Sequence, residues 1–206
     1  MFDPALFAAF LAAATILTLT PGVDTAMVLR AATVEGRRSA VLAAMGIGAG
    51  CLLWGAAVAL GLGALLRASE LAYGAVKVAG AVYLLWLGAG LLLHPRQALA
   101  EDAETGKTDR RDAFWRGLLT NLLNPKVGVF YVTFLPQFVP QGASVALTTF
   151  LLVCVHVVLG LVWFAALIAA TQPLGRFLRR PRAVRWLDRL TGAIFVGFGL
   201  RLALTR

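Results

Sequence analysis

The chain has 206 residues, of which 60% are hydrophobic and only 14% charged, and its formal net charge is +9. Soluble domains are nearer half apolar and a quarter charged, so this composition excludes an ordinary soluble protein and indicates an integral membrane protein. The apolar stretches are also too long and too uniformly apolar to be barrel strands, which alternate with a period of two.

We expect an all-α membrane protein with six transmembrane helices, because a hydrocarbon core about 30 Å thick needs roughly 20 helical residues per crossing. The expected spans are residues 5–29, 39–64, 70–93, 114–138, 144–171 and 184–204. The first span is not expected to be a cleaved signal, because no positive charge precedes it and its apolar run is too long.

The hydrophilic stretch at residues 94–113 reads as a cytoplasmic loop that separates two halves, 1–93 and 114–206, within a single transporter domain. Each half begins with a span interrupted by proline, "LTPGVDT" at 19–25 and "LLNPKVG" at 122–128. Three spans per half is an odd number, so the second half enters the membrane in the opposite sense. We therefore predict a 3+3 inverted repeat with broken helices 1 and 4, a pattern typical of secondary transporters.

The positive charges are distributed unevenly along the chain. Fourteen of the 19 Lys and Arg residues follow the first, third and fifth expected spans or lie in the loop after the third. Short loops rich in Lys and Arg stay cytoplasmic, so we expect a multi-pass protein of the bacterial cytoplasmic (inner) membrane with both termini on the outer, periplasmic side. This distribution favours membrane lipids as partners over nucleic acid.

The two helix breaks are expected at the same depth. Pro21 lies nine residues before Arg30, and Pro125 lies nine residues after Arg116. At 1.5 Å per residue, each proline is roughly 13–14 Å from a cytoplasmic charge, which is close to the midplane of a core about 30 Å thick. The breaks should therefore meet near the membrane centre.

Polar groups at these breaks point to a binding site for a small zwitterion. Proline removes a backbone donor and frees the carbonyl four residues earlier, and irregular backbone survives in a membrane only against protein or a watery cavity. Freed carbonyls and N–H groups suit the ammonium and carboxylate of an amino acid. The expected substrate or ion pathway residues are Pro21, Gly22, Asp24, Asn124, Pro125 and Lys126.

The two charged members of this set have a second interpretation. Asp24 and Lys126 would each cost about 2.5–3.5 kcal/mol at a helix centre, so neither is expected to face lipid. They can line a solute pathway, with Asp24 carrying a coupling proton if burial favours its protonated form. Alternatively they form a structural ion pair, or snorkel.

Three further polar residues are secondary candidates. Asn121 can contact solute or bond across helices as structural glue. His156 can relay protons, although a buried histidine with a satisfied hydrogen bond is the more common case. Lys77 can line the pathway, although snorkelling to the outer face fits its position better.

We expect neither an enzyme nor a cofactor. Two distant histidines and two intramembrane cysteines form no zinc pattern, and no Gly-rich phosphate loop with its lysine is present. The alternative function is a membrane thiol–disulfide electron carrier that uses Cys51 and Cys154. No proline or cation neighbours either cysteine to activate its thiol. A scaffold or passive pore is a third reading, one that needs no intramembrane charge.

Several stretches resemble the LysE/RhtB family of bacterial amino-acid exporters over essentially the full length. They are "LTPGVDT" at 19–25, "EGRRSAVLAAMGIGAG" at 35–50, "LGLGALL" at 60–66, "KVAGAVYLLWLGAGLL" at 77–92 and "FWRGLLTNLLNPKVGVFYVTFLPQFV" at 114–139. Asn-Pro-Lys followed by Leu-Pro-Gln-Phe is the most specific of these signatures.

The resemblance implies six helices in the cytoplasmic membrane and export of amino acids or related small solutes, driven by the proton-motive force. It assigns the family's Pro-Gly element to Pro21 and Gly22, its acidic position to Asp24, and its Asn-Pro-Lys element to residues 124–126. Two departures are Val23, where the family usually has a second proline, and Ala40, where glycine often follows "GRRS". The substrate and the number of copies in any homo-oligomer stay open.

Overall fold

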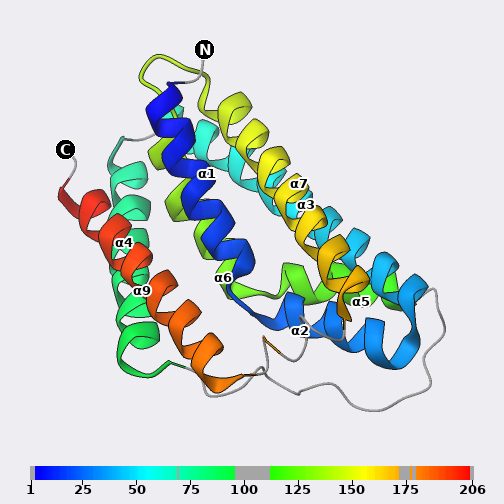
Figure 1. Cartoon of the computed structure of the whole chain (residues 1–206). Helices are drawn as coiled ribbons and strands as arrows, with labels where there is room; N and C mark the ends of the chain where they lie inside the picture. Colours follow the sequence, from blue (N-terminus) through cyan, green and yellow to red (C-terminus); the bar gives the residue numbers. More distant parts are fainter. Residues whose placement is uncertain (1–2, 69, 96–111, 172–176, 178–179, 205–206) are drawn as a thin grey trace.

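The computed structural model describes residues 3–68, 70–95, 112–171, 177 and 180–204 of the chain. All regular secondary structure in this part is helical, which confirms the all-α class (Figure 1). Most of the expected loop at 94–113 lies outside the described residues.

The helices follow the expected spans closely. In chain order they are α1 (Pro4–Leu19), α2 (Val23–Arg30), the π-helix η1 (Ala31–Glu35), α3 (Arg37–Ala68), α4 (Glu70–Leu93), α5 (Asp112–Leu122), α6 (Pro125–Val129), the π-helix η2 (Phe130–Phe134), the 3₁₀ helix η3 (Leu135–Phe138), α7 (Val145–Ala169) and α9 (Pro181–Leu204). Each expected span corresponds to one helix or to one run of consecutive helices.

Two described helices are long and apolar enough to cross a membrane, Arg37–Gly61 within α3 and Val145–Ala169. Two bent runs each count as one further broken span: α1 with Val23–Glu35, bent by 52°, and α5 with Lys126–Phe138, bent by 57°. Length and composition thus support two to four spans in the described part. Helices α4 and α9 lie where the other two were expected, and the count of six stays a prediction.

The outer surface of the bundle is apolar. Val158 and Val162 on α7 are 59% and 64% exposed, Trp86 on α4 is 67% exposed, and Leu60 on α3 is 71% exposed. Large apolar side chains on several helices would be unfavourable in water but are well solvated by lipid tails. The exposed surface therefore suits a protein surrounded by membrane.

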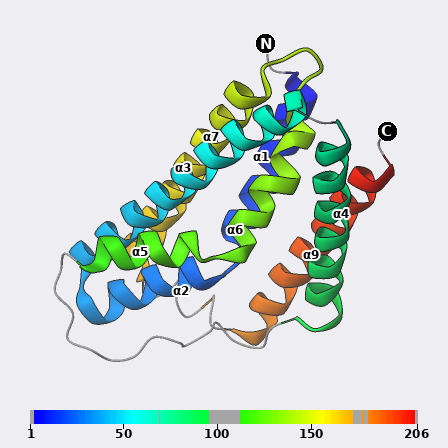
Figure 2. The ribbon, with the colours of Figure 1, turned by 180° about the vertical axis from the view of Figure 1, so that it is seen from behind.

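Glycines bring α3 and α5 into backbone contact. A methyl group added at Gly46 would lie 2.0 Å from the carbonyl oxygen of Phe114, and one at Gly117 would lie 2.2 Å from that of Ala43. Gly46 and Gly50, in "GIGAG", have the spacing of two small residues that lets membrane helices pack closely. These contacts hold the first turns of α5 against α3, and Gly50 lies against the Asn121 side chain near the end of α5, where the second break begins (Figure 2).

Helices α4 and α9 pack against each other in the same way and stand beside the other helices (Figure 1). A methyl group at Gly88 would lie 2.8 Å from the carbonyl oxygen of Gly192, and one at Gly192 would lie 2.7 Å from that of Gly88. Each glycine thus admits the partner backbone, which permits a close crossing between a helix of each half.

An aromatic cluster packs the second broken run against α1 and α9. The ring centroids of Phe130 and Phe134 are 4.5 Å apart, and those of Phe134 and Phe138 are 4.8 Å apart. Phe138 continues to Phe10 of α1 at 5.6 Å, and Phe134 packs on Phe198 of α9 at 4.2 Å. The cluster is part of the buried core, with Phe198 packed against it.

Candidate functional site

The first break separates α1 from α2. Pro21 has no N–H to bond the carbonyl of Leu17, so the helical hydrogen-bond pattern ends there. Thr20 and Gly22 are both extended, with φ, ψ of −69°, 116° and −140°, −169°. Helix α2 then starts in a new direction, and its cap at Gly22 has no side-chain hydrogen bond.

The second break separates α5 from α6. Asn124 is extended, with φ −79° and ψ 105°, and its side-chain oxygen accepts a hydrogen bond from the backbone N–H of Lys126 at 3.1 Å. The backbone N–H of Asn124 donates to the carbonyl of Asn121 at 3.0 Å. The indole Nε1 of Trp54 on α3 donates to the carbonyl of Leu122 at 3.2 Å. This break is therefore capped on both sides.

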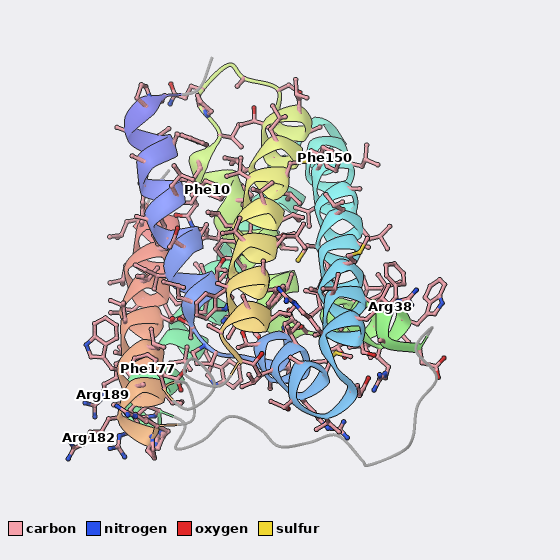
Figure 3. All side chains as sticks on the ribbon, turned by 45° about the vertical axis from the view of Figure 1, so that its right-hand side comes forward. Phe10, Arg38, Phe150, Phe177, Arg182 and Arg189 are labelled. Atoms are coloured by element: carbon pink, nitrogen blue, oxygen red, sulfur yellow. The ribbon has the colours of Figure 1, made fainter. Side chains whose placement is uncertain are left out.

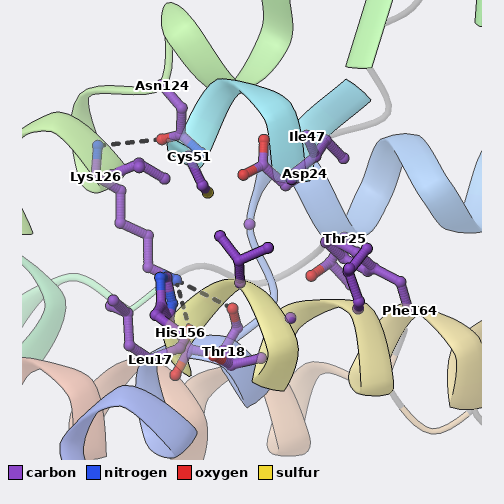
Figure 4. Close-up of a pocket in the computed structure, with 17 residues that line it drawn as sticks. Leu17, Thr18, Asp24, Thr25, Ile47, Cys51, Asn124, Lys126, His156 and Phe164 are labelled. Carbon is purple, nitrogen blue, oxygen red and sulfur yellow. Dashed lines mark hydrogen bonds between the residues drawn. The ribbon is translucent and has the colours of Figure 1, made fainter. Parts of the chain in front are cut away.

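The two breaks adjoin in the bundle interior. The Nζ of Lys126 donates to the carbonyl oxygens of Leu17 and Thr20, each at 3.1 Å (Figure 4). The Leu17 carbonyl is the one that Pro21 leaves without its helical donor. An ammonium from one half of the chain thus replaces the missing N–H of the other half. The Thr20 hydroxyl is in turn hydrogen-bonded to the hydroxyl of Thr191 on α9.

Asp24 in the first turn of α2 forms the other charged part of the site. Its Oδ2 accepts a hydrogen bond from Asn121 Nδ2 at 2.9 Å, and the same Nδ2 lies 3.4 Å from Cys51 Sγ. Its Oδ1 is buried and has no hydrogen-bond partner among the described residues. A buried carboxylate oxygen without a donor is costly, which is typical of a site that receives a ligand or a proton.

Both charges line one cavity of about 70 Å³ at the junction of the breaks (Figure 4). A water needs about 10–15 Å³ of such space, so the cavity has room for several waters. The lining residues are Leu17, Thr18, Thr20, Gly22, Asp24, Thr25, Ile47, Gly48, Cys51, Asn124, Lys126, Val127, His156, Val157, Gly160, Leu161 and Phe164.

Most of the predicted primary site residues line this cavity. Four of the six primary candidates line the cavity: Gly22, Asp24, Asn124 and Lys126. Pro21 is not among the described lining residues and ends the hydrogen-bonding of α1. Pro125 starts α6, and its side chain lies outside the described part of the chain.

The secondary candidates differ from one another. Asn121 is fully buried and is connected to the cavity by its hydrogen bond to Asp24. This position of Asn121 requires a glycine at residue 50, because a methyl group at Gly50 would lie 2.7 Å from Asn121 Oδ1. His156 lines the cavity while its Nδ1 is hydrogen-bonded to the hydroxyl of Tyr131 at 2.9 Å. His156 is thus a buried histidine whose Nδ1 has a hydrogen-bond partner, the more common of the two cases expected from the sequence. The side chain of Lys77 lies outside the described residues.

Two parts of the cavity were not predicted from the sequence. Thr18, Thr20 and Thr25 contribute hydroxyl groups, and their position around Pro21 in "TLTPGVDT" was the available signal. Much of the remaining wall comes from apolar residues of α7, whose sequence contains nothing to distinguish a cavity wall from a lipid-facing surface.

The two cysteines are free thiols. Cys51 is buried and lines the cavity, where it contacts the Asn121 amide, whereas Cys154 is not among the lining residues. Within the described part of the chain, no group of three or more His, Cys, Asp or Glu side chains is arranged to hold a metal ion.

Comparison with known proteins places these features in a family. A threonine efflux protein of Escherichia coli (strain K12) is 31% identical over 206 residues, covering 93% of this chain and 94% of that protein. A leucine efflux protein of Enterobacter sp. (strain 638) is 30% identical over 203 residues, covering 96% of this chain and 94% of that protein.

A membrane protein of Bacillus subtilis (strain 168), whose name states no substrate, is 26% identical over 205 residues, covering 96% of this chain and 98% of that protein. No solved structure matches the chain with statistical support. The family model described as LysE type translocator matches residues 15–206. The chain therefore belongs to the LysE family of membrane translocators.

Proposed function

We propose that the protein is a secondary-active exporter of amino acids or related small zwitterionic solutes, driven by the proton-motive force. The observation that carries this proposal is the cavity at the two helix breaks, which holds one carboxylate and one ammonium. These charges complement the ammonium and the carboxylate of a zwitterion. Relatives named for threonine efflux and leucine efflux support the same solute class.

In the proposed site, Lys126 and Asp24 bind opposite ends of the solute. Lys126 donates to the backbone carbonyls of Leu17 and Thr20, and a solute carboxylate would be a stronger, charge-assisted acceptor. The free Oδ1 of Asp24 supplies an acceptor for the solute ammonium. Pro21, Gly22, Asn124 and Pro125 shape the backbone around these two groups.

Asp24 is also the proposed carrier of the coupling proton. Its carboxylate is buried beside the cavity, and it interacts electrostatically with Lys126. Protonation would remove the negative charge and release a bound ammonium, so proton and solute binding would be linked. The hydrogen-bonded pair Tyr131 and His156 lies at the same cavity and is a secondary candidate for proton transfer.

Several structural features support the 3+3 inverted repeat, with halves 1–93 and 114–206 joined by the cytoplasmic loop 94–113. Each bent run continues from its short second helix into a π-helix, η1 or η2. Helix α3 of the first half packs on α5, and α7 of the second half packs on α1 and α2. These pairings are the ones that a two-fold relation between the halves would produce.

The distribution of charge supports an inner-membrane location with both termini on the periplasmic side. The two termini lie at one end of the molecule (Figure 1). Arg182 and Arg189 lie at the other end, and Arg38 lies below the level of Phe10 toward it (Figure 3). Basic residues at the end away from the termini support the proposal that this end is cytoplasmic.

The test is efflux of labelled amino acids from cells that express wild type, Lys126→Ala or Asp24→Asn at equal membrane levels. Arg38→Ala and Asp112→Asn are matched controls, because both residues are exposed and lie outside the cavity. We expect wild type and both controls to export. The two cavity variants should lose at least about a hundredfold, which corresponds to roughly 2.7 kcal/mol.

Retained export in both cavity variants would contradict the proposed site. Proton coupling is tested separately with a protonophore, which should abolish wild-type export against a gradient. Export that persists in cells depleted of their proton gradient would contradict coupling while leaving the solute class intact.

A further inference from the structure

The lining of the cavity combines charged and polar residues with a group of apolar residues and glycines. Asp24 and Lys126 contribute the charges of the lining, and Thr18, Thr20 and Thr25 are also lining residues. The apolar group, which we call the apolar wall, consists of Ile47 and Gly48 on α3 and Val157, Gly160, Leu161 and Phe164 on α7. The surroundings of two lining glycines differ accordingly. A methyl group at Gly22 would face Lys126 Nζ at 3.8 Å, whereas one at Gly48 would face Leu161 and Val157.

Packing between helices does not explain the two glycines of the apolar wall. At Gly55, on the same helix as Gly48, a methyl group would lie 2.5 Å from Val153 Cγ1, so α3 needs a glycine there. At Gly48 it would lie 3.6 Å from both Leu161 Cδ2 and Val157 Cγ1, an ordinary contact distance. At Gly160 it would meet nothing within 4 Å.

Backbone conformation does not explain them either. Among the described glycines, positive φ angles occur at Gly36 and Gly142, not at Gly48 or Gly160. Glycine inside a helix is less favourable than alanine, so both positions carry a cost without a structural gain. What the glycines do provide is empty space on the apolar side of a cavity of about 70 Å³.

We propose that Gly48 and Gly160 set the size of the solute side chain that the cavity accepts, with Leu161 and Val157 of α7 as the surface opposite Gly48. The inference rests on the proposed export function and specifies its substrate class. The solutes are amino acids with small to medium, uncharged, largely aliphatic side chains. A charged side chain against the apolar wall would have no partner there and would be excluded.

The size of the effect follows from the chemistry of the wall. One methylene more or less in an apolar pocket changes discrimination by about 10–200-fold. Gly48→Ala introduces one methyl group at an ordinary contact distance, so the variant should fold normally and reject the longer side chain. Leu161→Ala removes three carbon atoms from the opposing surface and should shift the preference toward larger side chains.

The experiment measures efflux of labelled alanine, leucine, phenylalanine, lysine and aspartate at equal membrane levels of each variant. The matched control is Gly61→Ala, because Gly61 is on α3, outside the cavity, and has open space around it. We expect Gly48→Ala to lower the leucine-to-alanine rate ratio at least about tenfold. Leu161→Ala should raise the phenylalanine-to-leucine ratio, and Gly61→Ala should leave both ratios within twofold.

Each contrary result has a distinct meaning. Unchanged ratios in Gly48→Ala, or the same change in Gly61→Ala, overturn the inference while export stands. Wild-type export confined to lysine or aspartate also overturns it without touching the export proposal. If Gly48→Ala exports nothing, the ratio in Leu161→Ala decides, and no shift there overturns the inference. If the wild type exports none of these amino acids, the result contradicts the proposed amino-acid export itself.

Discussion

At the first break, the carbonyl that Pro21 leaves without a donor is bonded by Lys126 from the other half of the chain. At the second break, the cap is local: Asn124 accepts from the backbone N–H of Lys126, two residues later. Trp54 adds a bond to Leu122 from the neighbouring helix α3, which is fastened to α5 by glycine contacts. The first break therefore depends on a residue from the second half of the chain, whereas the second break is stabilised by its own residues and by the neighbouring helix α3.

This difference separates a movable part from a fixed part. Hydrogen bonds to a charged group contribute about 1.5–3 kcal/mol, so withdrawing Lys126 from the first break has a cost that a bound solute carboxylate would offset. The second break keeps its caps whichever group Lys126 Nζ contacts. In the proposed cycle, solute binding therefore releases the first break and leaves the second unchanged.

Among changes that alter one break and leave the other in place, the largest effect is expected from repairing the first break. Pro21→Ala restores a backbone N–H that can bond the Leu17 carbonyl, so Lys126 loses one of its acceptors and α1 extends toward Gly22. Removing proline from a helix relieves about 3 kcal/mol of helical cost. We expect export to fall at least about tenfold, while the melting temperature in detergent stays equal or rises.

The matched control for this variant is Pro140→Ala, because Pro140 lies in the loop before α7 and outside the cavity. It should leave export unchanged. If Pro21→Ala instead lowers the melting temperature and exports normally, the first break serves the fold and its link to Lys126 has no role in transport.

The sequence predicted the polar half of this site and missed the apolar half, for a physical reason. Proline and charge are unfavourable inside a membrane helix, so Pro21 and Lys126 demand an explanation wherever they occur in an apolar span. Val157 and Leu161 are as favourable against lipid as in a cavity wall, so no sequence pattern distinguishes the two environments. Lys77 is also a charged residue within a span and became a candidate for the same reason, but its side chain lies outside the described residues.

Long-range hydrogen bonds were equally hidden. Trp54 caps a carbonyl 68 positions away in the sequence, and Lys126 caps one 109 positions away. Neither pairing follows from local periodicity, because both depend on how α3 and the two breaks pack. The span boundaries, by contrast, follow from hydropathy alone: the expected 70–93 corresponds to Glu70–Leu93.

A smaller effect, on stability, is expected at the second break. Asn124→Ala removes the side-chain acceptor that caps α6, and loss of such a cap costs about 0.5–2 kcal/mol. For a chain of this size each kcal/mol corresponds to about 2–4 °C in melting temperature. Asn124→Ser retains a capping oxygen and should recover most of the loss in thermal unfolding monitored in detergent. Equal losses in both variants would show that the local cap is not what stabilises this break.

The smallest expected effect concerns the two cysteines, and it tests whether the cavity performs redox chemistry instead of transport. Cys51 contacts Asn121 through a weak sulfur acceptor at 3.4 Å, while the stronger bond of Asn121 goes to Asp24 at 2.9 Å. Alanine at Cys51 leaves that stronger bond in place, and Cys154 is not a lining residue.

The double variant Cys51→Ala, Cys154→Ala should therefore export within about twofold of wild type, because neutral bonds to sulfur contribute little. The measurement is the same efflux assay at equal membrane levels, with Asn121→Ala as the sensitive comparison, since that variant removes the donor to Asp24 itself. Loss of activity in the cysteine variant with activity kept in Asn121→Ala would favour the thiol carrier. That outcome would also mean that the hydrogen bonds at the two breaks have no role in the function of the protein.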